Sequence, residues 1–217
     1  MQDVIGYHER FGGPKVLYRD ISAEPTFSIE REGQFNDTIS YFVPDGDGFL
    51  LSVLNSRIFW FWIKAKTPIA RGGFYRFKAQ YIEQAPIPPS TDAQKAKLGA
   101  LAEAAQAAAE QRYALQQDIT RRIPDLAPSG PAKLTTKLKE WWNLPDFAAF
   151  QAEVKKSLKA DIPLRERSDW DNWIAENRTQ IHALTAEIVR LEDDINARVY
   201  ALFDLTDDEI ALLEANI

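Results

Sequence analysis

The sequence predicts an α+β protein: a small β-rich domain with one central helix, followed by an all-α region with a long antiparallel helix pair. Three observations lead to this fold class. Short alternating segments separated by Gly- and Pro-rich turns occupy most of the first ninety residues. Apolar residues at three- and four-residue steps follow Gly48 and indicate a helix. Two much longer apolar stripes of the same spacing occur later in the chain.

The first ninety residues are predicted to alternate between strands and turns around the central helix. The expected elements are strands over 15–21, 26–30 and 38–43, a hairpin turn over 31–34, a helix from 48 to the break at Thr67-Pro68, and a strand over 74–82. The run Pro86-Ile87-Pro88-Pro89 then ends the domain, because neither a helix nor a central strand can continue through it.

The remainder of the chain is predicted to be helical. The expected helices run from Thr91 (with Ser90 as N-cap) to Ile123, over 133–144 and 146–159, from Ser168 to about Phe203, and from a capping box at Thr206 to the end. The two long helices are of similar length, and pairing them antiparallel buries both apolar stripes. We therefore expect two domains, 1–89 and 90–217, the second a coiled-coil-like spacer or docking region.

Composition supports this division and narrows the functional classes. Residues 1–90 hold ten basic and ten acidic residues, whereas 91–217 hold sixteen basic and twenty-two acidic ones. The chain has no cysteine and only two histidines, which excludes disulfides and makes a zinc site an unfavourable interpretation. No apolar run is long enough to span a bilayer, so we expect a soluble, cytoplasmic protein with no membrane partner.

A local cationic window stands out in this acidic chain of net charge −6. No acidic residue lies between Asp47 and Glu83, while six cations do: Arg57, Lys64, Lys66, Arg71, Arg76 and Lys78. Lys and Arg neutralise phosphates, and an Arg fork matches the edge of guanine. We predict that Arg57, Lys64, Lys66 and Lys78 meet phosphates. The simpler alternative is a solvated surface with no ligand.

Candidate base-contacting residues lie in and beside this window. Arg71 and Arg76 are predicted to enter a groove, and Gly72 and Gly73 would let the backbone approach a duplex. The amides Gln34, Asn36 and Gln80 are candidates to read adenine. For each amide a turn or a solvent-facing position is the competing interpretation.

The common enzyme motifs do not occur. The sequence has no GxxxxGK[ST], GxGxxG, HExxH or GxSxG. Pro124-Asp125 with Glu153-Val154-Lys155 imitates the residues of a metal nuclease, but the first pair is predicted in a loop and the second on a helix. A binding module is therefore the better interpretation than an enzyme.

Several ordered segments resemble a known family. These are GGPKVLYRDIS, TFSIE, FNDTISYFVP, LLSVLNSRIFWFWI and RGGFYRFKAQYIEQAPIP, with the tail VYALFDLTDDEIALLE. In order and spacing the first five resemble the TaqI-like C-terminal specificity domain of adenine-specific DNA methyltransferases, and the matching part of type IIG restriction-modification enzymes. The tail resembles the C-terminal end of such proteins. The resemblance covers about residues 5–90, and it implies a target recognition domain that binds double-stranded DNA.

The resemblance also implies what should accompany this chain. In the family a separate N-terminal domain binds S-adenosylmethionine and methylates a flipped adenine, and its Asn-Pro-Pro-aromatic and glycine motifs have no counterpart here. We therefore expect a fragment without catalytic residues, metal or cofactor of its own, whose partner is a methyltransferase domain or subunit. Two alternatives are a specificity subunit of a type I-like restriction system, whose paired helices act as a spacer, and a helical protein-interaction adaptor.

Overall fold

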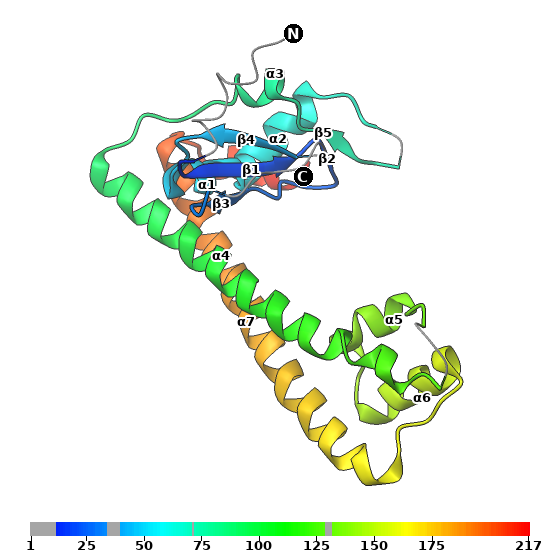
Figure 1. The fold of residues 1–217 in the computed structure, drawn as a ribbon. Helices are drawn as coiled ribbons and strands as arrows, with labels where there is room; N and C mark the ends of the chain where they lie inside the picture. The colour runs from blue at the N-terminus through cyan, green and yellow to red at the C-terminus, as the bar shows by residue number, and fades with distance from the viewer. Residues whose placement is uncertain (1–11, 34–39, 71, 129–131) are drawn as a thin grey trace. The chain divides into compact units, whose positions relative to one another are not determined.

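The computed structural model describes residues 12–33, 40–70, 72–128 and 132–217. The chain forms two compact units. The first unit consists of Met1–Gln106 together with Arg190–Ile217, and the second of Ala107–Val189. Two long helices, α4 (Asp92–Thr120) and α7 (Arg167–Leu202), contribute to both (Figure 1). Composition changes near residue 89, but the first unit also contains the end of the chain.

The first unit is built on two small antiparallel sheets, as the α+β fold class predicts. Their strands are β1 (Lys15–Arg19), β2 (Ile21–Ser22), β3 (Ser28–Glu30), β4 (Ser40–Pro44) and β5 (Tyr75–Arg76). One sheet has the order β3-β1-β4, and the other pairs β2 with β5. In the larger sheet Val16 lies opposite both Ile29 and Val43. This face is buried, since Val16 is fully inaccessible and Ile29 nearly so.

The predicted helix after Gly48 is two helices, α1 (Gly48–Leu54) and α2 (Arg57–Lys66). The interruption has a local cause. Ser56 caps α2 by accepting a hydrogen bond from Phe59 N, so a new helix begins there. Asn55 turns its amide to the strand region instead: its Oδ1 accepts from Phe27 N (2.9 Å) and its Nδ2 donates to Phe27 O (3.0 Å). The apolar periodicity continues across the break, which is why the sequence predicts one helix.

The strand predicted over 74–82 is wrong beyond its first residues. β5 covers only Tyr75–Arg76, and Phe77 N donates the last bond of this ribbon to Asp20 O (2.7 Å). A helical turn, α3 (Ala79–Ile82), follows with Lys78 as its N-cap residue. The apolar positions 77 and 82 are both buried, and a helical turn brings Ile82 inward where continued alternation would not.

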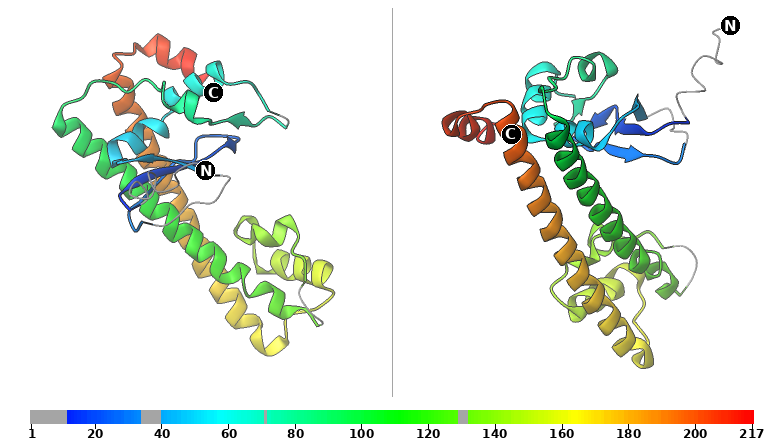
Figure 2. Two further views of the ribbon diagram at one scale, coloured as in Figure 1. Left: turned by 45° about the horizontal axis from the view of Figure 1, so that its top comes forward. Right: turned by 90° about the vertical axis from the view of Figure 1, so that its left-hand side faces the viewer.

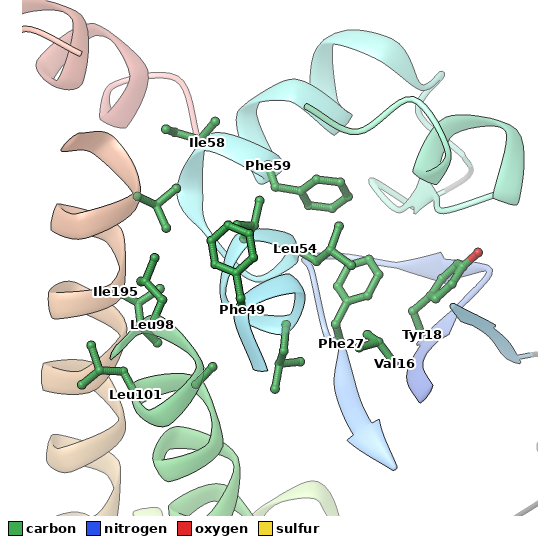
Figure 3. Close-up of a cluster of buried hydrophobic side chains, with 14 of the residues drawn as sticks. Val16, Tyr18, Phe27, Phe49, Leu54, Ile58, Phe59, Leu98, Leu101 and Ile195 are labelled. Carbon is green, nitrogen blue, oxygen red and sulfur yellow. The ribbon is translucent and has the colours of Figure 1, made fainter. Parts of the chain in front are cut away.

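Aromatic side chains form the centre of the first unit's core (Figure 3). Phe27 meets Phe59 and Phe77 edge-on, with ring centroids 5.4 and 6.0 Å apart. The beginning of α4 contributes Leu98 and Leu101, and the end of α7 contributes Ile195. Residues 190–217 are thus part of the same core as the sheets.

A close backbone contact joins α1 to α4 inside the first unit. A Cβ placed on Gly48 would lie 2.8 Å from both Cα and O of Gly99. No larger residue fits at Gly48 unless α4 moves away. The two glycines therefore set how closely these helices approach.

The second unit is entirely helical among its described residues. Between the two long helices lie η2 (Ile123–Leu126), α5 (Thr136–Lys139), η3 (Trp141–Asn143), α6 (Phe147–Leu158) and η4 (Leu164–Glu166). Trp141, Phe150 and Ile181 are among its fully buried residues. The two long helices run antiparallel here (Figure 2), and Arg112 of α4 donates to Thr185 of α7 (3.3 Å). The predicted helix pair is confirmed.

The capping predictions have mixed outcomes. The capping box at Thr206 is confirmed, and it opens α8 (Asp207–Glu214). The predicted cap Ser90 is wrong: Thr91 caps α4, since its Oγ1 accepts from Gln94 N while Gln94 Oε1 accepts from Thr91 N. The helix predicted over 133–144 is also wrong. It is replaced by the single turn α5 and by η3, because Glu140 leaves helical geometry with ψ of 39°.

Candidate nucleic-acid interface

The candidate interface is a short β-ribbon at the exit of α2. β2 and β5 pair with Ile21 opposite Arg76 and Ser22 opposite Tyr75 (Figure 1). On the other edge of β5, Tyr75 forms an antiparallel bridge with Ile69, followed by a bond from Ala70 N to Phe74 O (2.7 Å). A turn lies beyond this bond.

Gly72 and Gly73 form part of that turn, and both are exposed. Their φ angles are +87° and +82°, in the region that glycine adopts without strain. A side chain at Gly72 would be strained for this reason. The positive φ angles are therefore the reason that glycine is needed at these two positions. The approach of Gly72 and Gly73 to a duplex stays a prediction.

The two faces of the ribbon differ in character. Tyr75 and Phe77 point inward, with their rings 4.9 and 6.3 Å from the ring of Trp60. Ile21 shares the opposite face with Arg76 as its cross-strand partner, and the alternation of side chains along a strand assigns Phe74, the residue just before β5, to that face too. The outward face therefore places one guanidinium between two apolar side chains.

Asp20 orients Arg76 on this face. Its Oδ2 lies 3.4 Å from Arg76 Nη1, and its backbone carbonyl accepts from Phe77 N. Its second carboxylate oxygen, Oδ1, is buried and has no hydrogen-bond partner among the described residues. Sequence reasoning did not select Asp20, because its partner Arg76 is 56 positions away and no local pattern links them.

Three further predicted residues lie close in sequence to the ribbon. Lys66 ends α2, and Lys78 and Gln80 stand at the start of α3; all three are exposed. The Lys78 side chain makes no capping bond to the helix. The Gln80 backbone carbonyl accepts a bond from Gln84.

Arg57 is engaged elsewhere in the first unit. Its guanidinium forms ion pairs with Asp193 of α7 (2.8 Å) and Glu214 of α8 (2.9 Å), and its backbone N donates to Asn196 Oδ1 (2.8 Å). Burial acts to lower the pKa of Arg57, but its hydrogen bonds to Tyr200 and Glu214 outweigh that effect and raise it. This cation holds the C-terminal helix against α2.

Lys64 has a similar position. Its ammonium donates to the carbonyl oxygen of Asn216 (2.8 Å) and lies over the Trp60 ring, 5.5 Å from its centroid. α8 therefore covers the side of α2 that carries Arg57 and Lys64. Those of the predicted cations that the structure describes do not form one continuous surface: Arg57 and Lys64 face the C-terminal segment, whereas Arg76 lies on the ribbon.

The other predicted contacts cannot be placed. Arg71, Gln34 and Asn36 lie outside the described residues. Among the described residues, the candidate interface is the outward ribbon face with Lys66, Lys78 and Gln80.

The residues that imitate a metal nuclease have structural roles in the second unit. Glu153 is buried and accepts a hydrogen bond from Thr135, the cap of α5 (3.0 Å), while Asp125 pairs with Arg122 (3.8 Å). Within the described ranges no three His, Cys, Asp or Glu side chains gather closely enough to hold a metal ion. Nor does any helix in those ranges have the length and apolar character to cross a membrane.

Comparison with known families covers nearly the whole chain. Residues 3–87 match the model of the TaqI-like C-terminal specificity domain. Residues 91–199 match a domain of unknown function (DUF8810). No curated protein matches the chain. The chain thus belongs over half its length to the family described as Domain of unknown function (DUF8810), and it carries at its N-terminus a TaqI-like C-terminal specificity domain.

Proposed function

We propose that this protein is the sequence-specific DNA recognition module of a restriction-modification enzyme of the adenine-specific, type IIG-like kind. The match of residues 3–87 to the TaqI-like specificity domain carries the proposal. The exposed cations beside the ribbon support it, because the window between Asp47 and Glu83 contains no acidic residue to repel a phosphate backbone.

The proposed mechanism divides the work among the exposed residues. Lys66 and Lys78 neutralise phosphates and position the module, since a lysine ammonium acts as a point charge. Arg76, oriented by Asp20, donates to the O6 and N7 atoms of guanine in the major groove. Gln80 lies within the same short segment and is the candidate for adenine. Arg57 and Lys64 stabilise the fold instead, because the C-terminal segment already holds them.

Salt-dependent binding tests this function. Fluorescence anisotropy is measured with the full chain and a labelled duplex library between about 50 and 200 mM salt. For the two phosphate contacts of Lys66 and Lys78 the slope of log K against log salt is about −1.8, so affinity falls roughly 12-fold over this range. Lys66→Ala and Lys78→Ala should each reduce the magnitude of the slope by about 0.9.

Lys97→Ala is the matched control, since Lys97 is exposed in the same unit but on α4. It should leave the slope unchanged. Duplex affinity that does not change with salt, or a salt slope that is reduced equally in all three variants, contradicts the proposal.

A methyltransferase that binds S-adenosylmethionine is the proposed partner, as a domain or as a subunit. The chain would direct it to its target, and base flipping and methyl transfer would take place on that partner. The test mixes the chain with a methyltransferase subunit of the same system and measures transfer of labelled methyl groups to adenine. The subunit alone should be inactive or non-selective; equal activity with and without the chain speaks against the partnership.

A type I-like specificity subunit is the second candidate. The antiparallel pairing of α4 and α7 in the second unit favours it, because paired long helices suit a spacer. Analytical ultracentrifugation with a methyltransferase subunit tests this candidate: a spacer predicts a stable complex of defined stoichiometry in the absence of DNA, and the lack of such a complex contradicts it.

A further inference from the structure

The outward face of the β2–β5 ribbon exposes apolar side chains that the proposed function does not yet use. Ile21 and Phe74 each remain 42% exposed, although both lie on an ordered ribbon beside the core. Their neighbours Tyr75 and Phe77 show that the ribbon can bury aromatic rings, on its other face. The exposed pair therefore needs an explanation of its own.

The two side chains flank a single cation. Ile21 is directly opposite Arg76 in the register, and Phe74 precedes Arg76 by two residues on the same face. Cross-strand partners on one face stand about 5 Å apart, and residues two apart on a strand stand about 6.8 Å apart. Base pairs in a duplex are spaced by about 3.4 Å. Each apolar side chain thus lies one or two base pairs from whatever Arg76 contacts.

Charge complementarity favours a nucleic acid as the occupant of this face. Arg76 stands beside Ile21 in the register, Lys78 follows Arg76 by two residues, and the segment from Gly48 to Ile82 that carries β5 is free of acidic residues. Asp20, the acidic residue beside Arg76, is occupied in pairing with it.

We propose, on the basis of the function proposed above, that Ile21 and Phe74 determine specificity by packing against the C5-methyl groups of thymines one or two base pairs from a guanine read by Arg76. The methyl group is the apolar feature of the major-groove edge, and it distinguishes thymine from every other unmodified base. Arg76 contacts the guanine through two N–H donors. Ile21 and Phe74 select thymine at the neighbouring positions. The three residues together read a short T- and G-containing sequence.

The test replaces thymine by uracil, which lacks only this methyl group. A random duplex library is first selected with the full chain, and each thymine of the preferred sequence is then replaced singly by deoxyuridine. Replacement at one or two thymines near a guanine should weaken binding about fourfold each, the ratio expected for one methyl-sized group removed from water. Replacement elsewhere should have no effect.

Variants assign the effect to the two residues. Ile21→Ala and Phe74→Ala should each bind one thymine duplex and its uracil counterpart equally, with unchanged circular dichroism because both side chains are exposed. Leu212→Ala is the control: Leu212 is 66% exposed on α8 and should keep the full discrimination.

Three outcomes separate this inference from the function beneath it. If the wild-type chain binds thymine and uracil duplexes equally at every position while binding stays salt-dependent and sequence-selective, the methyl contact is refuted and the recognition function stands. If both alanine variants still discriminate as the wild type does, Ile21 and Phe74 are not the reading residues. If no sequence is enriched and no duplex binds, the recognition function itself fails.

Discussion

Gln106 takes the place of a neighbouring strand for Ile29. Its Nε2 donates to the carbonyl oxygen of Ile29 (2.9 Å), and its Oε1 accepts from the backbone N of Ile29 (2.7 Å). Asn55 forms the same reciprocal pair with Phe27, two residues earlier. Two side-chain amides thus satisfy the backbone hydrogen-bonding groups along the free edge of β3. An unpaired sheet edge can form strand pairs with another molecule, and these amides prevent such pairing.

Gln106→Ala should lower the free energy of unfolding by about 1–3 kcal/mol, because it leaves a partly buried N–H and C=O of Ile29 without partners. Urea unfolding followed by circular dichroism measures the change. Gln111→Ala, at an exposed glutamine further along α4, should change stability by less than about 0.5 kcal/mol. Equal effects of the two substitutions would show that the amide pair contributes nothing specific.

Arg57 and Lys66 should respond in opposite ways to removal, although both belong to the cationic window. Arg57→Ala removes ion pairs to Asp193 and Glu214 and should lower stability by roughly 1 kcal/mol, with the salt slope of DNA binding unchanged. Lys66→Ala should leave stability unchanged and reduce the magnitude of the salt slope of DNA binding, since Lys66 is exposed at the end of α2. Thermal unfolding and anisotropy titrations on both variants provide the comparison. A reduced slope for Arg57→Ala would mean that this residue leaves α8 to meet DNA.

A chain truncated after residue 89 should not form a cooperatively folded domain. The core of the first unit includes residues of α4, α7 and α8, and truncation removes them: Leu98, Leu101, Ala102, Leu191, Ile195, Val199, Tyr200 and Leu213. Their loss exposes the apolar sides of α1 and α2 to water. Near-ultraviolet circular dichroism and amide proton dispersion should show loss of fixed tertiary packing. A well-dispersed spectrum from residues 1–89 would place the folding boundary at the proline run instead.

Alkaline pH should release the C-terminal segment through Tyr200. Burial, and then the hydrogen bond to Glu214, raise the pKa of Tyr200 to about 12, whereas an unfolded tyrosine titrates near 10. The folded state holds this proton more tightly, so the stabilisation is complete below about pH 10 and is lost as the pH rises through about 12.

Tyr200→Phe isolates this contribution, because the other tyrosines remain in both proteins. The wild type should lose stability relative to the variant between about pH 10 and 12, and the difference should be constant below about pH 9. Urea midpoints measured across this range give the comparison. Parallel curves over the whole range would show that Tyr200 titrates normally.

The elements with strong local signals were predictable from the sequence. The long apolar stripes gave α4 and α7 nearly in full, and the Thr206 capping box stands where the pattern places it. The predicted ends of an element were wrong where a polar group distant in sequence sets the boundary. Asn55 interrupts the central helix because Phe27 offers it two backbone partners, and the strand after Phe74 stops because Asp20 ends its ladder. Neither partner is visible in a window of sequence.

The candidate site was predictable in composition and not in arrangement. A window free of acidic residues identified Arg76 and Lys78, which the structure places on the ribbon and at the start of α3. The same window included Arg57 and Lys64, because nothing local indicates that Asp193, Glu214 and Asn216 would meet them. The distribution of charge along the sequence indicates which cations could bind DNA. Only the tertiary contacts show which of them are already paired within the fold.

The approach of Gly48 to Gly99 places a limit on exchanging specificity between related proteins. A grafted N-terminal segment joins this helical framework only if it too lacks a side chain where α1 meets α4, since even one methyl group at that position would collide with the main chain of its new host. Chimaeras that keep both glycines should accept foreign reading surfaces, whereas a single alanine at position 48 should make an otherwise compatible graft misassemble.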